Sequence, residues 1–148
     1  MQNIQKITAI ETFPVRHPIL RSGKPIATCH FDGDDLTTTT HFGLFIEENL
    51  IGVISIFEMK NPLFTADKQF QIRGMAVLEE LQKKGFGADL VAHAEHFITS
   101  QKGNLIWFNA RINAVGFYEK LGYTIIGNAF EIEGVGTHYV LYKEVGAL

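Results

Sequence analysis

Hydrophobic and polar positions alternate in several segments of the chain, and this alternation predicts strands separated by turns. The period is two from Phe42 to Ile46 and again from Ile51 to Phe57, with a turn at Glu48–Asn49 between them. Because strand side chains point alternately to the two faces of a sheet, these segments predict a β-hairpin. Five further strands are expected, at residues 4–10, 70–78, 104–109, 123–126 and 138–143.

A period near 3.6 replaces this alternation in the predicted helices. Apolar residues between Leu90 and Ile98 recur at helical spacing and mark one face of a helix. A short helix is expected from Asn113 to Leu121, where Gly122 ends it, and another from Pro14 to Leu20. The Gly-, Asp- and Thr-rich segment from Arg21 to Thr40 predicts a long ordered loop. The order of elements indicates an α/β protein with a mixed sheet and helices on both faces.

Composition narrows the class of protein. The 148 residues predict a single domain spanning 1–148, with 46% hydrophobic and 20% charged residues. A net charge of -3 argues against nucleic acid as the main partner. No segment has the apolar length of a membrane span, and the first six residues lack a signal-peptide pattern, so no membrane partner is expected. One cysteine, Cys29, suits a reducing compartment, and a cytoplasmic location is expected.

A basic, glycine-containing loop lies between the expected strand at 70–78 and the helix that carries Leu90. The N-terminus of a helix has unpaired backbone N–H groups and a dipole that favours negative charge. Glycines let this backbone approach an anion closely, and lysines add positive charge. The loop therefore predicts a phosphate-binding site made by Gln82, Lys83, Lys84, Gly85, Phe86, Gly87 and Ala88.

Other chemical sites are less well supported. The glycine loop is no dinucleotide-binding fingerprint, because Leu90 stands where a third glycine is required, and no P-loop lysine follows. His93 and His96 are three residues apart rather than the four of a zinc-binding helix, so no metal site is expected. Cys29 and His30 are adjacent and point to opposite sides of an extended chain, which argues against a nucleophile and its base.

Two motifs in this order and at this spacing resemble the GNAT superfamily of acyl-CoA-dependent N-acetyltransferases. The first is Gln82-x-x-Gly85-x-Gly87, which resembles the pyrophosphate loop of that superfamily, and the second is the run from Phe117 to Tyr123. The resemblance implies a mostly antiparallel, twisted sheet of six to seven strands. It also implies a splay between the two central strands, between Val77 and Asn109, and acetyl-CoA as the acyl donor.

The resemblance further implies how the coenzyme is held and used. Its peptide-like arm would pair with the edge formed by Met75, Ala76 and Val77, and the Val77 N–H would stabilise the negative charge on the thioester oxygen. Tyr118 would protonate the departing thiolate, since a phenol of ordinary pKa stays protonated at neutral pH. The alternative for Tyr118 is an amphipathic core residue.

Coenzyme contacts on the second motif's side depart from the family pattern. Arg111 stands where the superfamily often has an asparagine that contacts the coenzyme. Asn109 and Asn113 flank this position and are expected to contribute contacts, together with Phe117 and Tyr118. The alternative is that Arg111 itself pairs with a phosphate of the coenzyme.

The acceptor is expected to be a primary amine that the sequence does not identify. Glu58 and His41 are candidates for accepting its proton, directly or through a water. Three cations that could hold a carboxylate of the acceptor are Arg16, Arg21 and Arg73.

Alternatives remain open for these cations and for the whole protein. The cations could instead pair with Asp32, Asp34 and Asp35 as a structural clamp on the long loop. A protein that binds acyl-CoA as a sensor and catalyses nothing is the second functional hypothesis, and homodimerisation is left open.

Overall fold

A seven-stranded sheet carries the fold in the computed structural model, which describes residues 1–146. The strands run in the order β1-β2-β3-β4-β5-β7-β6, and every neighbouring pair is antiparallel except β4 and β5. This confirms the expected mixed, mostly antiparallel sheet. The strands are β1 (Gln2–Ile7), β2 (Thr39–Ile46), β3 (Asn49–Glu58), β4 (Gln69–Val77), β5 (Leu105–Arg111), β6 (Thr124–Ile132) and β7 (Gly136–Glu144).

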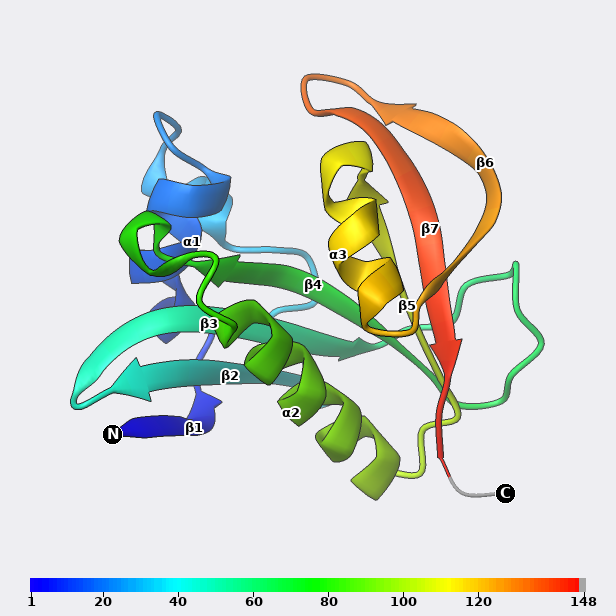
Figure 1. The fold of residues 1–148 in the computed structure, drawn as a ribbon, viewed down its shortest axis with the longest axis horizontal. Helices are drawn as coiled ribbons and strands as arrows, with labels where there is room; N and C mark the ends of the chain where they lie inside the picture. Colours follow the sequence, from blue (N-terminus) through cyan, green and yellow to red (C-terminus); the bar gives the residue numbers. More distant parts are fainter. Residues whose placement is uncertain (147–148) are drawn as a thin grey trace.

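The two parallel strands at the centre pair over only part of their length. Gln69–Gln71 of β4 pair with Leu105–Trp107 of β5, and no pair follows. Beyond these residues the strands diverge, as Figure 1 shows. The splay expected between Val77 and Asn109 is thus confirmed, and it leaves one edge of β4 without a neighbouring strand.

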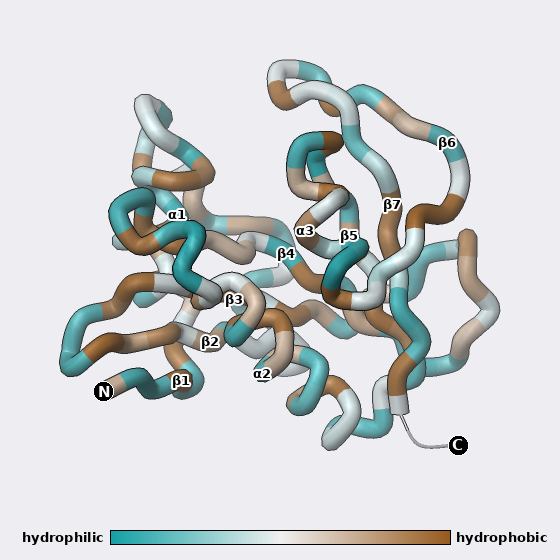
Figure 2. The backbone as a smooth tube through the Cα atoms, viewed as in Figure 1, coloured by the Kyte–Doolittle hydropathy of each residue, from teal (hydrophilic) through white to brown (hydrophobic). Residues whose placement is uncertain are grey.

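Helices cover both faces of the sheet, as expected. Side chains alternate along β3, so that Ile54 belongs to the core under α2 (Phe86–Ser100), whereas Val53 packs with Val15 of α1 (Phe13–Leu20) on the other face. The third helix, α3 (Val115–Lys120), lies on the α2 face, where Tyr118 joins the same core. Figure 2 shows the β2–β3 turn as a hydrophilic end to two largely hydrophobic strands.

Four short 3₁₀ segments lie in the connections between the helices and strands of the described chain. One of them explains why β1 ends at Ile7 and not at Ile10 as expected. Thr8 N–H donates to Glu11 Oε1 (2.8 Å), and Glu11 N–H donates to Thr8 Oγ1 (3.3 Å), so this reciprocal pair turns the chain toward α1. The segments are η1 (Ile10–Thr12), η2 (Ile26–Cys29), η3 (Glu79–Leu81) and η4 (Ile112–Ala114).

Other boundaries also differ from the expected ones. The hairpin turn includes Glu47, whose φ is 57°, so the turn begins one residue before Glu48–Asn49. Residues 112–114 form η4 and not the first turn of α3. The strand expected at 123–126 continues to Ile132, because Gly127 takes a φ of 77° that bends β6 without ending its pairing with β7.

Candidate active site

The loop that joins β4 to α2 has the geometry of an anion site. Gly85 caps the N-terminus of α2 with a φ of 92°, and Lys83 has a φ of 63°, so both lie in the left-handed region. No side chain caps the helix. The N–H groups of its first turn are therefore unpaired and can bind phosphate oxygens. Lys83 and Lys84 are exposed beside them.

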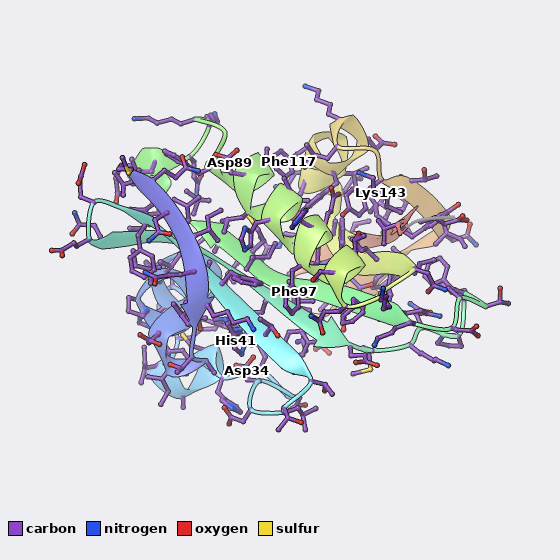
Figure 3. All side chains as sticks on the ribbon, turned by 90° about the horizontal axis from the view of Figure 1, so that it is seen from below. Asp34, His41, Asp89, Phe97, Phe117 and Lys143 are labelled. Carbon is purple, nitrogen blue, oxygen red and sulfur yellow. The ribbon has the colours of Figure 1, made fainter. Side chains whose placement is uncertain are left out.

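Three elements meet at Gly87, in the first turn of α2. A Cβ on Gly87 would lie 3.3 Å from Cζ of Phe117 on α3 and 3.4 Å from Cε of Met75 on β4. Figure 3 shows Phe117 on α3 near the N-terminal end of α2. Sequence reasoning predicted all three residues as coenzyme contacts, and the fold brings them together across the mouth of the splay.

The end of β4 directs backbone groups into the splay. Leu78 N–H donates to Ile51 O of β3 at 2.9 Å. Because consecutive N–H groups of a strand point to opposite sides, the N–H of Val77 faces away from β3, toward the gap. The Gln82 amide donates to the Val77 carbonyl at 2.9 Å, so this predicted coenzyme residue also braces the strand end.

Tyr118 lies on α3 with its ring 4.4 Å from that of Phe108 on β5. Burial raises the pKa of Tyr118 to about 12, so the phenol is protonated at neutral pH. Within residues 1–146, the one fully buried side-chain nitrogen or oxygen without a partner is Arg16 Nε. The Tyr118 hydroxyl is not fully buried and has no hydrogen bond within that range either, so its proton is available to a ligand.

The outer half of β5 presents different residues to its two faces. Phe108 and Ala110 belong to the core under α2 and α3, so Asn109 and Arg111 point to the opposite face. Asn109 is therefore on the other side of the sheet from the glycine loop. Asn113 is exposed on η4.

His138 of β7 joins the same face as Asn109 and Arg111. It is the register partner of Arg111, and its ring lies 5.9 Å from that of Phe130. Sequence reasoning missed this residue. Its alternation with Val140 and Tyr142 in the predicted last strand is the signal that could have placed it on this face.

On the α1 face, Arg16 lies in a buried polar network. Its guanidinium donates to both carboxylate oxygens of Asp34 (2.6 and 3.1 Å), to Cys29 O (2.8 Å) and to Ser55 Oγ (2.8 Å), and it has no solvent exposure. Although burial raises the pKa of Asp34, hydrogen bonds from Arg16 and from the Phe31 N–H hold it below its usual value. The geometry of Arg16 is that of the structural clamp.

His41 belongs to this network. Its Nδ1 is 2.6 Å from Ser55 Oγ and its Nε2 is 3.0 Å from Asp34 O, and Figure 3 shows it beside Asp34. Since Arg16 donates to the Ser55 hydroxyl, that hydroxyl donates to Nδ1 of a neutral His41, whose Nε2–H donates to Asp34 O. Burial lowers the pKa of His41, which favours this neutral form. Both ring nitrogens are therefore engaged.

Glu58 lies far along the sheet from the splay. It is exposed at the end of β3 and pairs in register with Phe70, where β4 and β5 are still joined. The fold therefore does not bring Glu58 and His41 together at the gap.

Other features bear on the remaining expectations. Burial raises the pKa of the Cys29 thiol, which keeps it in the unreactive form. Among residues 1–146, no three His, Cys, Asp or Glu side chains are grouped so that they could hold a metal ion. No helix of that part of the chain combines the length and the apolar character needed to cross a bilayer.

Comparisons with known proteins agree with this geometry. Residues 34–140 match the family model described as an acetyltransferase (GNAT) domain. An uncharacterised N-acetyltransferase of Bacillus subtilis, YitI, is 35% identical over 143 residues, which cover 97% of this chain and 96% of that protein.

Solved structures share the fold at low sequence identity. The ribosomal-protein-S18-alanine N-acetyltransferase of Escherichia coli superposes with a TM-score of 0.79 at 13% identity, over 100% of this chain and 96% of that one. A Bacillus subtilis acetyltransferase in complex with CoA gives a TM-score of 0.69 at 19% identity, over 98% and 99% of the two chains.

Proposed function

The chain belongs to the GNAT acetyltransferase family, and from that premise we propose that it transfers an acetyl group from acetyl-CoA to a primary amine by direct attack in a ternary complex. One observation carries the proposal. The unpaired edge of β4 is followed, after η3, by the glycine loop at the start of α2, a helix that no described side chain caps. A peptide-like arm that ends in a pyrophosphate matches this combination of strand edge and anion site.

In the proposed complex, the pyrophosphate accepts hydrogen bonds from the backbone N–H groups that follow Gly85. The pantetheine amides pair with the edge of β4 between Met75 and Val77, as an added strand would. Phe117 lies against this path, because it contacts the first turn of α2 at Gly87. The thioester then lies at the inner end of the splay.

The reaction forms an N–C bond and breaks the C–S bond. The amine attacks the thioester carbonyl carbon, and the Val77 N–H stabilises the oxyanion that develops. The intermediate collapses and expels the thiolate, which takes the proton of the Tyr118 hydroxyl, and water then returns a proton to Tyr118, whose raised pKa favours the phenol. The proton lost by the amine passes to water, because both ring nitrogens of His41 are engaged and Glu58 lies at the paired end of the strands.

Calorimetry with acetyl-CoA and a thiol-release assay with a panel of amines test the proposal together. Saturable binding and release of CoA thiol that depends on an amine are expected. Binding without turnover on any amine would instead favour the non-catalytic sensor.

Two variants at Gly85 test the coenzyme site itself. A Cβ on Gly85 would meet no described atom within 4 Å, so there is room to begin a side chain, although the φ of 92° costs about 1–2 kcal/mol for most residues. Gly85→Asp should lose coenzyme binding, because it places negative charge at the phosphates. Gly85→Asn, which has the same shape and tolerates this backbone, should retain weakened binding. Equal affinity in the wild type and a folded Gly85→Asp variant would refute the site.

A further inference from the structure

Three guanidinium groups surround one aromatic ring on the α1 face of the sheet. The Cζ atoms of Arg16, Arg21 and Arg73 lie 3.9, 4.9 and 5.1 Å from the ring centre of Phe31. Phe31 is 6% exposed, so the ring is a fixed platform for all three. Such stacking orients the planar groups and leaves their N–H edges available.

Among residues 1–146, one of the three cations has a carboxylate partner. Arg16 takes both oxygens of Asp34. Arg21 bonds the carbonyls of Thr28 (3.2 Å) and Leu20 (3.0 Å). Within residues 1–146, neither Arg21 nor Arg73 has a carboxylate within ion-pair distance.

Arg73 makes fewer hydrogen bonds than Arg21, although its guanidinium also lies 5.2 Å from the ring centre of Phe57. Its Nη1 reaches only the Asp32 carbonyl, at 3.5 Å. Burial lowers the pKa of Arg73, so its environment opposes the charge that the residue carries. An anion placed beside this half-buried guanidinium would relieve that cost.

The position of Arg73 relates this charge to the splay. Arg73 lies two residues beyond Gln71, the last residue of β4 that pairs with β5. Its neighbour Ile72 belongs to the core under α2, so the Arg73 side chain points to the opposite face. Arg73 is therefore beside the opening of the gap, on the face away from the coenzyme loop.

The backbone of β4 is shaped to admit this cluster. Gly74 has a φ of 65°, and the β3–β4 register shifts between Val53 and Ser55. A Cβ on Gly74 would lie 2.9 Å from Cε2 of Phe31, which is too close for any other residue. The bulge and the glycine together seat the Phe31 ring against the strand, directly beside Arg73.

We propose that Arg73, with Arg21 and the Phe31 platform, binds a carboxylate of the acceptor, so that the acceptor is a small molecule carrying both a primary amine and a carboxylate. This inference rests on the proposed function, because it names the acceptor of that same site. Arginine suits a carboxylate because its planar fork makes two parallel hydrogen bonds. Arg16 takes no part in binding, and its ion pair with Asp34 holds the platform in place.

The test combines variants of Arg73 with pairs of acceptors that differ in their anionic group. Thiol release is measured with L-amino acids, β-alanine and γ-aminobutyrate, each beside its own carboxamide, and with phosphoethanolamine beside ethanolamine. The proteins are the wild type, Arg73→Gln, Arg73→Lys and Lys24→Gln. Lys24→Gln is the control, because it removes an exposed cation from the long loop that also carries Arg21 and Phe31.

A specific pattern of Michaelis constants is expected. Arg73→Gln should raise the KM of the best amino-carboxylate by roughly tenfold or more, the effect of losing a hydrogen bond to a charged group. It should leave the KM values of the matching carboxamide and of acetyl-CoA unchanged. Arg73→Lys should recover part of the loss, and Lys24→Gln should behave as the wild type.

Several outcomes would overturn the inference while leaving the proposed function intact. Equal use of amino-carboxylates and carboxamides would do so, as would a clear preference for phosphoethanolamine. So would an Arg73→Gln effect confined to the KM of acetyl-CoA. If Arg73→Gln does not fold, Arg21→Gln provides the same comparison on the same platform.

Failure of the proposed function gives a different result. In that case no amine supports turnover, and calorimetry on the protein saturated with CoA then measures binding of the amino-carboxylates directly. Binding that Arg73→Gln abolishes would support the carboxylate site. Absence of binding to the wild type would overturn it.

Discussion

Asp34 and Arg16 show how a single buried pair can fix a long loop. Both side chains are fully buried, and the pair joins the loop before β2 to α1. Removing one partner would leave an uncompensated charge in the interior. We expect Asp34→Ala to lower the free energy of unfolding by about 3–5 kcal/mol.

Asp35 offers a matched control for this substitution. It is exposed and pairs with the exposed His30 at 2.8 Å. Surface pairs of this kind contribute at most about 1 kcal/mol, so Asp35→Ala should be close to the wild type. Urea denaturation of both variants measures the difference, and equal losses would show that the buried pair does not hold the loop.

Tyr118 is the residue whose chemistry can be separated from its packing. Tyr118→Phe keeps the ring against Phe108 and removes only the hydroxyl. If that hydroxyl donates to the leaving sulfur, kcat should fall about a hundredfold or more, while the KM for acetyl-CoA changes less than roughly twofold. Steady-state kinetics measures both constants. A wild-type kcat would return Tyr118 to the role of a core residue.

The sequence supports a more specific prediction for the proposed coenzyme side of the site than for the acceptor side. Gly85, Gly87 and Phe117 lie in two short, local motifs whose geometry depends mainly on neighbouring residues. The pairing of Arg16 with Asp34 depends on long-range packing that brings α1, β3 and the long loop together. Sequence spacing therefore supports the structural clamp and the binding of an acceptor carboxylate equally. In the fold, Arg16 and Arg73 have different surroundings, which separates the two roles.

At the scale of elements, Gly87 is a point where α2, α3 and β4 come together. Gly87→Ala would place a methyl group 3.3 Å from Phe117 and 3.4 Å from Met75, so the Phe117 ring, which lies against the proposed coenzyme path, must shift slightly. We expect a several-fold loss of affinity for acetyl-CoA, measured by calorimetry. Gly116→Ala on α3 meets no atom within 4 Å, and it should raise stability by about 0.5–1 kcal/mol without changing affinity. Unchanged affinity in Gly87→Ala would remove this point of contact from the coenzyme site.

The types and order of the elements follow from periodicity, whereas several boundaries depend on local hydrogen bonds that periodicity does not report. Apolar residues continue to Ile10, yet the Thr8–Glu11 pair ends β1 at Ile7. Likewise β6 passes through Gly127 because its partner strand β7 continues beside it, which is a tertiary effect.

For the whole molecule, one buried and one half-buried histidine make stability depend on pH. Burial lowers the pKa of both His41 and His93 below the usual 6.5, so the unfolded chain binds protons that the folded chain resists. Stability should be full above about pH 6.5 and decline as the pH falls below it. Below about pH 3.8, protonation of Asp34 removes a further contribution, since its pKa is also lowered.

Denaturation midpoints measured from pH 7.5 down to about pH 5 check this dependence. His41→Gln should flatten the decline more than His93→Gln, because His41 is the more deeply buried. An unchanged slope in both variants would show that neither histidine causes it.

Because β4 and β5 pair only at Gln69–Gln71, the sheet has two parts, one made of β1 to β4 and the other of β5, β7 and β6, and they are joined only at that pairing. The loop after β3 is bonded to the end at which β4 and β5 are paired. Trp107 Nε1–H donates to Met59 O at 2.8 Å, and the Gln69 amide donates to the carbonyls of Phe64 and Ala66. The angle between the two parts of the sheet is thus set at the end away from the opening of the splay. Substitutions at Trp107 or Gln69 could widen or narrow the opening and alter which acyl chains fit, although neither residue would touch the coenzyme.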